Sequence, residues 1–236
     1  MVTTLYLIRH GETEGSGIKR YTGSINVALS QKGAEQMKGT SALLLKHLLK
    51  SASSQSYSYL RDIYRLSAPR SEPTHSDMKL QAVYCSDLSR AMKSAEIIAE
   101  PHGIKAVVVK DLRERNFGIW EGLTFTEIRE RYPEEFRSWA DNPLKFSPIG
   151  GESTIEVRDR IIPAMEEIIN GHCGEQIAIV AHGGVNRIML CHILGIPLEN
   201  IFRIEQDNGA VNIIEFWDRY PVMKLLNGRA ASIGIL

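Results

Sequence analysis

Two stretches of the chain share one pattern, a run of apolar and aromatic residues that stops at a histidine followed by glycine. Residues 5–8 lead into Arg9 and His10, and residues 177–181 lead into His182. Short runs of this kind predict buried strands, and the glycine after each histidine predicts that the strand ends there. Carboxyl ends of parallel strands meet at one edge of an α/β sheet, where ligands bind. We therefore expect both histidines at one shared site.

The remaining apolar pattern alternates between strand and helix periodicity. Further strands are predicted at residues 81–86, 106–109, 202–206 and 210–217. Helices are predicted from an N-cap at Ser30 to about residue 50, and at 87–99, 125–139, 154–171 and 185–194. This order of elements predicts an α/β fold, a three-layer αβα sandwich with a largely parallel central sheet. We expect a single domain over residues 1–236.

One stretch interrupts the alternation. Residues 51 to about 79 are rich in serine and contain Pro69 and Pro73. Such a composition buries little apolar area, so we expect a surface insertion there. Apolar spacing within residues 57–66 also fits a short amphipathic helix, which leaves open whether the insertion covers the site or is a passive excursion.

Charge and composition narrow the class of partner. The chain has 236 residues, of which 43% are hydrophobic and 24% are charged, with 28 Lys plus Arg balanced by 28 Asp plus Glu. A neutral overall balance provides no field that attracts nucleic acid or an anionic membrane, so we expect neither as a partner. Any affinity for phosphate must come from a local cluster of cations.

Cysteine usage and hydropathy predict the compartment. The three cysteines, Cys85, Cys173 and Cys191, are odd in number and have no metal-ligand spacing, so we expect reduced thiols and no metal site. No signal-peptide pattern precedes the first predicted strand, and no apolar run is long enough to span a bilayer. We expect a cytoplasmic protein.

Two further features place cations near the same edge of the sheet. A loop at residues 14–23 contains three glycines, which permit a ligand to approach the backbone, together with Lys19 and Arg20. Arg90 lies in the first turn of the helix that follows the strand at 81–86. A guanidinium there can reach an anion that the helix N-terminus also favours, although a solvated arginine or an ordinary loop explains each feature taken alone.

Taken together, four segments in order resemble the histidine phosphatase superfamily, which includes the cofactor-dependent phosphoglycerate mutases. They are residues 7–13 (LIRHGET), 86–91 (SDLSRA), 112–122 (LRERNFGIWEG) and 181–183 (AHG). The resemblance covers nearly the whole chain and implies a phosphoglycerate mutase-like fold. The stretch at 51–79 matches no part of the family pattern.

The resemblance implies a role for each charged side chain of these segments. His10 is the nucleophile that becomes phosphohistidine, and Arg9, Arg90 and His182 surround the phosphoryl oxygens. Glu114 protonates the departing alkoxide and then, as a carboxylate, takes a proton from the attacking water. Because cationic side chains surround the phosphate, we expect no metal and no cofactor.

The same resemblance implies contacts to the substrate phosphate from four further positions. Backbone N–H groups near Thr22, Gly23 and Gly183 are expected to hold phosphate or substrate. In the mutases a Trp-Asn pair follows the first motif, whereas Gly15 and Ser16 stand here, so we expect Ser16 to replace the asparagine as a phosphate contact.

These departures favour a phosphatase over a mutase. The segment from residue 13 to 30 resembles that of α-ribazole 5′-phosphate phosphatases, which act in assembly of the cobalamin nucleotide loop. We therefore predict a metal-independent phosphomonoester hydrolase acting on a small phosphorylated metabolite, with α-ribazole 5′-phosphate as a candidate. Two alternatives stay open: a phosphoglycerate mutase-type phosphotransferase and a non-catalytic phosphate-sensing protein. A nucleotide-binding Rossmann protein is disfavoured because no G-x-G-x-x-G follows the first strand.

Overall fold

A computed structural model of the chain describes residues 2–16, 20–53, 78–217 and 220–230, and its centre is a six-stranded sheet. The order across the sheet is β3 (Ala106–Val108), β2 (Ala82–Cys85), β4 (Gln176–Ala181), β1 (Val2–Arg9), β5 (Val211–Trp217) and β6 (Tyr220–Gly228). Strands β3, β2, β4 and β1 are parallel, whereas β5 and β6 are antiparallel to their neighbours. The predicted α/β class with a largely parallel sheet is confirmed.

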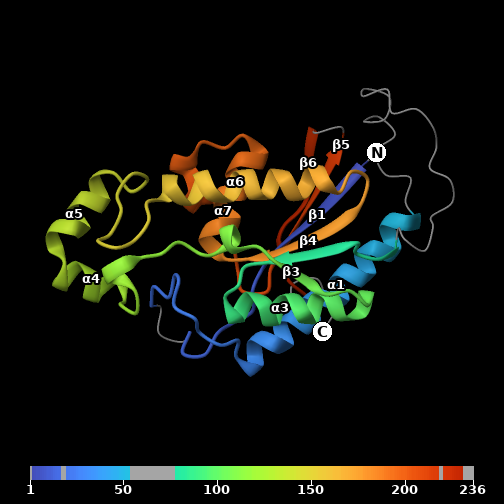
Figure 1. Cartoon of the computed structure of the whole chain (residues 1–236), viewed down its shortest axis with the longest axis horizontal. Coiled ribbons are helices and arrows are strands. Elements are labelled where there is room, and N and C mark those ends of the chain that lie inside the picture. Colours follow the sequence, from blue (N-terminus) through green and yellow to red (C-terminus); the bar gives the residue numbers. More distant parts are fainter. Residues whose placement is uncertain (1, 17–19, 54–77, 218–219, 231–236) are drawn as a thin grey trace.

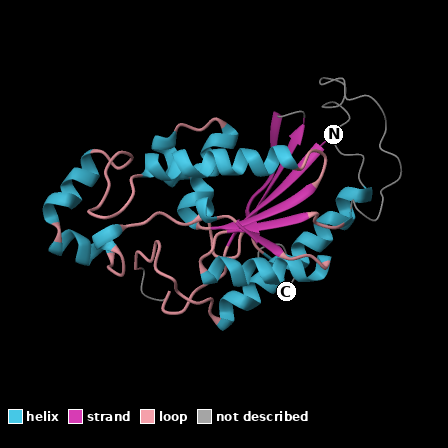
Figure 2. Cartoon of the chain, viewed as in Figure 1, coloured by secondary structure: helices cyan, strands magenta, loops and turns pink. Residues whose placement is uncertain are grey.

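Helices cover both faces of this sheet, so the molecule has the expected three layers (Figures 1 and 2). On one face lie α1 (Gln31–Ser53) and α3 (Ser89–Ala99), and on the other α6 (Thr154–Gly171) and α7 (Gly183–Leu194). Two short helices, α4 (Phe125–Arg131) and α5 (Pro133–Asp141), extend away from the sheet in Figure 1. Four 3₁₀ turns complete the described elements: η2 (Glu100–His102), η3 (Lys110–Leu112), η4 (Gly118–Trp120) and η5 (Leu198–Arg203).

Strand β1 forms part of both hydrophobic cores because its side chains alternate between the two faces of the sheet. Leu5 and Leu7 pack in the cluster that contains α6 and α7, while Tyr6 and Ile8 pack in the cluster with α1 and α3. All four are fully buried. Burying a side chain of this size stabilises a fold by roughly 1.5–3 kcal/mol, so the apolar run before His10 anchors that residue to the centre of the sheet.

One predicted strand is wrong, and one strand was missed. Residues 202–206 do not form a strand: η5 ends at Arg203, and the buried Ile201 and Ile204 flank an exposed Phe202, which is the three-residue spacing of a helical turn. The edge strand β6 was not predicted because its partly exposed residues give no clear apolar alternation.

The predicted helix at 125–139 is in fact two helices. Helix α4 ends before Tyr132 and α5 begins at Pro133, because proline has no N–H to continue the helix and its ring clashes with the preceding turn. The N-cap predicted at Ser30 is confirmed, since its hydroxyl accepts a hydrogen bond from Gly33 N at 3.0 Å.

The serine-rich stretch begins inside α1, which continues to Ser53. Residues 54–77 lie outside the described part of the chain, including the amphipathic helix considered for 57–66. Among the helices that the structure describes, none combines the length and apolarity needed to cross a bilayer.

Candidate active site

The two histidines follow neighbouring parallel strands at the same level of the sheet. Arg9, the last residue of β1, is the register partner of Ala181, the last residue of β4. The backbone N–H of His10 donates to Ala181 O at 3.0 Å, and the rings of His10 and His182 have centroids 5.1 Å apart with planes at 64°. Both side chains are buried. The sheet therefore brings the two imidazoles together at its carboxyl edge.

His10 is held by its neighbour's backbone so that one ring nitrogen stays available. Its Nδ1 lies 2.7 Å from Gly11 O, and since a carbonyl can only accept, Nδ1 carries the proton. Burial, followed by the charges of Arg9 and Arg90, holds the pKa of His10 well below its ordinary value. The ring is therefore neutral at neutral pH, and its Nε2 lone pair is free to attack.

His182 is also neutral and is oriented by a serine. Its Nε2 lies 2.7 Å from Ser86 Oγ, and Leu88 N donates to the same hydroxyl at 3.4 Å. Burial, followed by the charges of His10, Arg90 and Arg9, holds the pKa of His182 well below its ordinary value. If the Ser86 hydroxyl donates to Nε2, the ring proton is on Nδ1, which then faces the site as a hydrogen-bond donor.

The two arginines are fixed by backbone carbonyls of distant segments. Arg9 Nη1 donates to Gln206 O at 2.5 Å. Arg90, with only 1% of its surface exposed, donates through Nη1 to Ile25 O at 2.7 Å and through Nη2 to Gly23 O at 2.6 Å. Both guanidinium groups are thus locked in one orientation with few other rotamers open to them.

Two guanidinium donors and one imidazole nitrogen of this cluster are buried and have no hydrogen-bond partner among the described residues. They are Arg9 Nε, Arg90 Nε and His182 Nδ1. Burying an unpaired polar N–H costs about 1–3 kcal/mol, so such donors call for an acceptor. Helix α7 begins at Gly183, directly after His182, and its N-terminus adds favourable partial charge for an anion. The arrangement fits a tetrahedral oxyanion beside His10.

Glu114 lies at the same edge and is held by two backbone N–H groups. Its Oε2 accepts from Gly184 N at 2.9 Å and its Oε1 from Arg115 N at 3.0 Å. Glycine at position 184 permits this approach, because a Cβ there would lie 2.7 Å from Glu114 Oε1 and displace the carboxylate. The second residue of α7 thereby couples the carboxylate to the helix that begins directly after His182.

Arg160 on α6 fixes the segment that carries Glu114. It forms an ion pair with Glu152 at 2.8 Å and donates to the backbone carbonyls of Asp111, Arg113 and Glu114 at 2.6–3.2 Å. Irregular loop backbone has no regular hydrogen-bond partners, so the half-buried guanidinium of Arg160 supplies them. Neither Arg160 nor Glu152 was predicted from the sequence.

The predicted phosphate-binding loop is only partly assembled at the site. Gly23 contributes its carbonyl to Arg90, and Gly183 lies close enough to Arg9 that a Cβ there would be 3.2 Å from Nε. Ser16 instead hydrogen-bonds Glu12, whose pKa is lowered first by the hydrogen bond from Lys32 and least by that from Ser16. Thr22 accepts from Ile25 N at 2.6 Å in a tight turn. The phosphate contacts expected from Ser16, Thr22, Gly23 and Gly183 all stay predictions.

A sequence comparison assigns the family. The sequence profile described as histidine phosphatase superfamily (branch 1) matches residues 5–58 and 65–229. The chain belongs to the histidine phosphatase superfamily. The expectation that the stretch at 51–79 has no counterpart in the family is wrong for most of its length, since the profile matches residues 51–58 and 65–79 and leaves out only residues 59–64.

Similar proteins are named as phosphatases. Phosphoserine phosphatase 1 of Hydrogenobacter thermophilus is 29% identical over 94% of this chain and 91% of its own. The adenosylcobalamin/alpha-ribazole phosphatase of Escherichia coli is 22% identical over 97% and 98%. The crystal structure of the alpha-ribazole phosphatase from Shigella flexneri superposes with a TM-score of 0.76 at 22% identity, covering 95% and 96%, which shows the same fold. The family and the enzyme class predicted from the sequence are confirmed.

Sequence reasoning missed the polar network behind the arginine of this histidine phosphatase. Gln206, which holds Arg9 through its carbonyl, exchanges hydrogen bonds with Asn212 at 2.8 and 2.9 Å, and Asn212 Nδ2 donates to Leu7 O at 2.9 Å. Asn212 and Gln206 are 0% and 1% exposed. A polar residue among the apolar residues of a predicted strand is the signal that could have found Asn212.

A cavity of about 290 Å³ opens beside Arg9, Glu114 and Gly183. Most of its other lining residues belong to two walls. One wall is formed by η4, α4 and α5 with Trp120, Phe125, Ile128, Phe136 and Trp139, and the other by α7 and η5 with Arg187, Ile188, Ile201 and Phe202. The organic part of a phosphate ester bound at the histidines would extend into this space.

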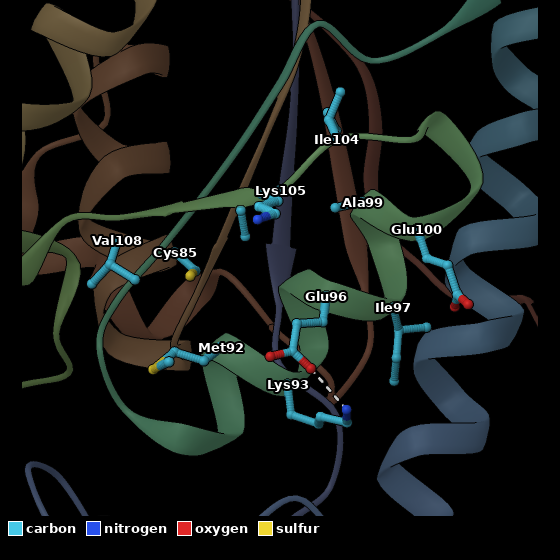
Figure 3. A pocket seen from close by; sticks show the side chains of 11 residues that line it. Cys85, Met92, Lys93, Glu96, Ile97, Ala99, Glu100, Ile104, Lys105 and Val108 are labelled. Atoms are coloured by element: carbon cyan, nitrogen blue, oxygen red, sulfur yellow. Dashed lines mark hydrogen bonds and ion pairs between the residues drawn. The ribbon is translucent and has the colours of Figure 1, made fainter.

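A larger cavity of about 510 Å³ lies away from both histidines, between α3 and strands β2 and β3 (Figure 3). Two of its charged side chains, Lys93 and Glu96, form an ion pair at 2.7 Å, and none of its lining residues belongs to the site described above. Cys85 at its floor has a pKa raised to about 12 by burial, so its thiol is not a nucleophile at neutral pH.

Proposed function

We propose that this histidine phosphatase hydrolyses the phosphomonoester of a small metabolite through a phosphohistidine on His10. The observation that carries the proposal is the state of His10: a buried, neutral ring whose Nδ1 proton is bound by Gly11 O. The lone pair of Nε2 is therefore available beside a cluster of cationic and neutral N–H donors.

In the first step Nε2 of His10 attacks phosphorus and the bond between phosphorus and the ester oxygen breaks. The equatorial oxygens carry the negative charge of this transition state, and Arg9, Arg90 and His182 supply donors for them. Glu114 gives its proton to the departing alkoxide, so the alcohol leaves neutral.

In the second step a water molecule attacks the phosphohistidine. Glu114, now a carboxylate, takes one proton of that water while the bond between phosphorus and His10 Nε2 breaks. Inorganic phosphate leaves and His10 returns to its neutral state. The charge stabilisation in both steps comes from fixed guanidinium groups, so we propose that no metal ion takes part.

For the substrate, the names of relatives support a phosphorylated metabolite of low mass. Relatives are named for phosphoserine, glucosyl-3-phosphoglycerate and alpha-ribazole phosphate. We keep α-ribazole 5′-phosphate as a candidate, with the other two as comparison substrates. Ser16, Thr22, Gly23 and Gly183 are proposed as phosphate contacts.

The test is hydrolysis of 4-nitrophenyl phosphate in the presence of EDTA, followed by a panel of these three metabolites. We expect turnover by the wild-type chain, loss of turnover in His10→Ala, and a phosphoenzyme after acid quench that mass spectrometry places on residue 10. Turnover that requires added metal contradicts the proposal. Phosphate binding without any phosphoenzyme would favour a sensing protein, and isomerised phosphoglycerate would favour a mutase.

A further inference from the structure

We propose that the cavity beside the phosphate site is an aromatic subsite, which selects phosphate esters whose organic part is a planar apolar group. The inference rests on the proposed function for the position of the phosphate and goes beyond it by naming the class of alcohol. The cavity of about 290 Å³ is close to the lower end of the size range for small-molecule sites, which begins at about 300 Å³.

Aromatic side chains dominate the wall formed by α4 and α5. Phe125, Phe136 and Trp139 contact one another, with ring centroids 5.1 Å (Phe125–Phe136), 6.0 Å (Phe125–Trp139) and 5.5 Å (Phe136–Trp139) apart. Trp120, at the inner end, stacks on Phe146 at 5.2 Å and 25°. Rings that already support one another present a preorganised surface, which lowers the entropic cost of holding a planar ligand.

The charged groups between this wall and the phosphate site are already engaged by the protein. Arg115 uses Nε, Nη1 and Nη2 to bind Glu152 O, Thr154 Oγ1 and Phe146 O, and its guanidinium lies 5.3 Å from the centroid of Phe117. Arg115 therefore has a structural role, because each of its three guanidinium nitrogens already has a partner in the protein. These contacts use three of the five N–H groups of a guanidinium, which reduces its capacity to bind a carboxylate of the substrate.

Arg187 on the opposite wall is held by one hydrogen bond, from its Nε to Ile204 O at 2.7 Å. Its Nη2 lies 3.9 Å from the largely exposed Glu205 Oε1, which is too long for a hydrogen bond and a weak ion pair. An anionic group on the alcohol, as in phosphoserine or phosphoglycerate, is the competing occupant of this wall, and the test below includes a carboxylate probe for it.

Two large aromatic side chains lie at the cavity with much of their surface exposed. Phe202 on η5 is 69% exposed and Phe125 on α4 is 45% exposed, and both line the cavity from different walls. Burying an exposed apolar ring lowers the free energy, so a ligand that covers these rings gains binding free energy. A planar group between the walls would cover both, so the ligand itself supplies the missing contact.

The test measures affinity for two phosphonates that differ only in a ring, 2-phenylethylphosphonate and ethylphosphonate, by calorimetry. Phosphonates are not hydrolysed, so binding is read independently of turnover. We expect the wild-type chain to bind the phenyl compound at least about tenfold more tightly, the value of one buried aromatic contact. We expect Phe202→Ala and Phe125→Ala each to reduce that preference about threefold to tenfold without changing the affinity for ethylphosphonate.

The matched control is Leu49→Ala, since Leu49 on α1 is 59% exposed and does not line the cavity. It should leave both affinities unchanged. Phe125 contacts two other rings, so its replacement could also disturb the fold. The melting temperature of the Phe125→Ala variant is therefore recorded, and Phe125→Leu serves as the conservative variant. Phe202 forms no ring–ring contact with another described residue, in contrast to Phe125. Its replacement therefore tests the ligand contact with less effect on neighbouring side chains.

Equal affinity for the two phosphonates overturns the subsite, as does a preference that survives both phenylalanine variants. Tighter binding of 2-carboxyethylphosphonate than of the phenyl compound also overturns it, in favour of a small acidic alcohol held by Arg187. Ring-dependent binding with no hydrolysis of 2-phenylethyl phosphate would support the subsite while refuting the proposed function.

Discussion

The hydroxyl of Ser86 and the Nε2 atom of His182 lie 2.7 Å apart, and this contact joins the ends of two neighbouring strands. Ser86 follows β2, whose last residue, Cys85, is in register with Val180 of β4. Pairing of β4 with β1 aligns His10 with His182, and pairing of β4 with β2 on its other side places the serine beside the second imidazole. Ser86 is a positioning residue, since it acts through His182.

We expect Ser86→Ala to lower kcat/KM about tenfold to a hundredfold, because the buried Nε2 of His182 loses its partner and the ring loses its orientation. Steady-state kinetics with 4-nitrophenyl phosphate measure the loss. The matched control is Ser41→Ala, a buried serine on α1 whose hydroxyl has no partner among the described residues. Unchanged activity in Ser86→Ala would show that His182 needs no such support.

We expect the effect of Glu114→Gln to depend on the leaving group. An alkoxide needs a proton as it departs, whereas 4-nitrophenolate is stable without one. The kcat/KM of the variant should therefore fall about 10²–10⁴-fold with an alkyl phosphate and far less with 4-nitrophenyl phosphate. Parallel kcat/KM measurements with the two esters test this. An equal loss on both would assign Glu114 a role in binding or folding instead.

Gly184→Ala should separate activity from stability. The added Cβ would lie 2.7 Å from Glu114 Oε1, the far end of a flexible side chain, so the carboxylate moves while the helix stays intact. We expect lower kcat with alkyl esters and an unchanged or slightly higher melting temperature, because alanine favours helices over glycine by up to about 1 kcal/mol.

The control for this variant is Gly171→Ala, at the end of α6, where an added Cβ meets nothing within 4 Å. It should change neither activity nor the chemistry of the site. Should Gly184→Ala keep full activity, the contact between Gly184 and Glu114 would have no part in catalysis.

The depressed histidine pKa values predict how stability depends on pH. Below the ordinary pKa of 6.5 the unfolded chain binds a proton on His182 that the folded chain does not. The free energy of unfolding should therefore fall as the pH decreases from 6.5, with a slope for this group that approaches about 1.4 kcal/mol per pH unit. Above pH 6.5 the group has no such effect.

Urea unfolding of the wild-type chain and His182→Gln at several pH values between 5 and 7.5 measures this slope. The variant should lose the contribution of one histidine, so its stability falls less steeply below pH 6.5. Parallel slopes for the two proteins would mean that His182 titrates in the fold as it does in the unfolded chain.

Strong periodicity was the most reliable guide to the elements. Unbroken apolar runs predicted the strands before His10 and His182, and an apolar stripe predicted the helix from Ser30. Such patterns are needed to fill the cores on the two faces of the sheet. Weak patterns failed: the half-exposed β6 has no apolar alternation, and Pro133 divides a helical pattern that otherwise continues. Local signals describe burial well and the ends of elements poorly.

The sequence by itself determined the ends of two strands, the histidine after each of them and the four family segments. The reason is that apolar runs of strand length have few ways to be buried, and parallel strands align their carboxyl ends. Only the tertiary structure decided the partners of the arginines. The acceptors of Arg9 and Arg90 are backbone carbonyls of Gln206, Ile25 and Gly23. Every residue has a backbone carbonyl, so the sequence does not indicate which of them accepts. The cavity likewise exists only where α4 and α5 face α7 and η5.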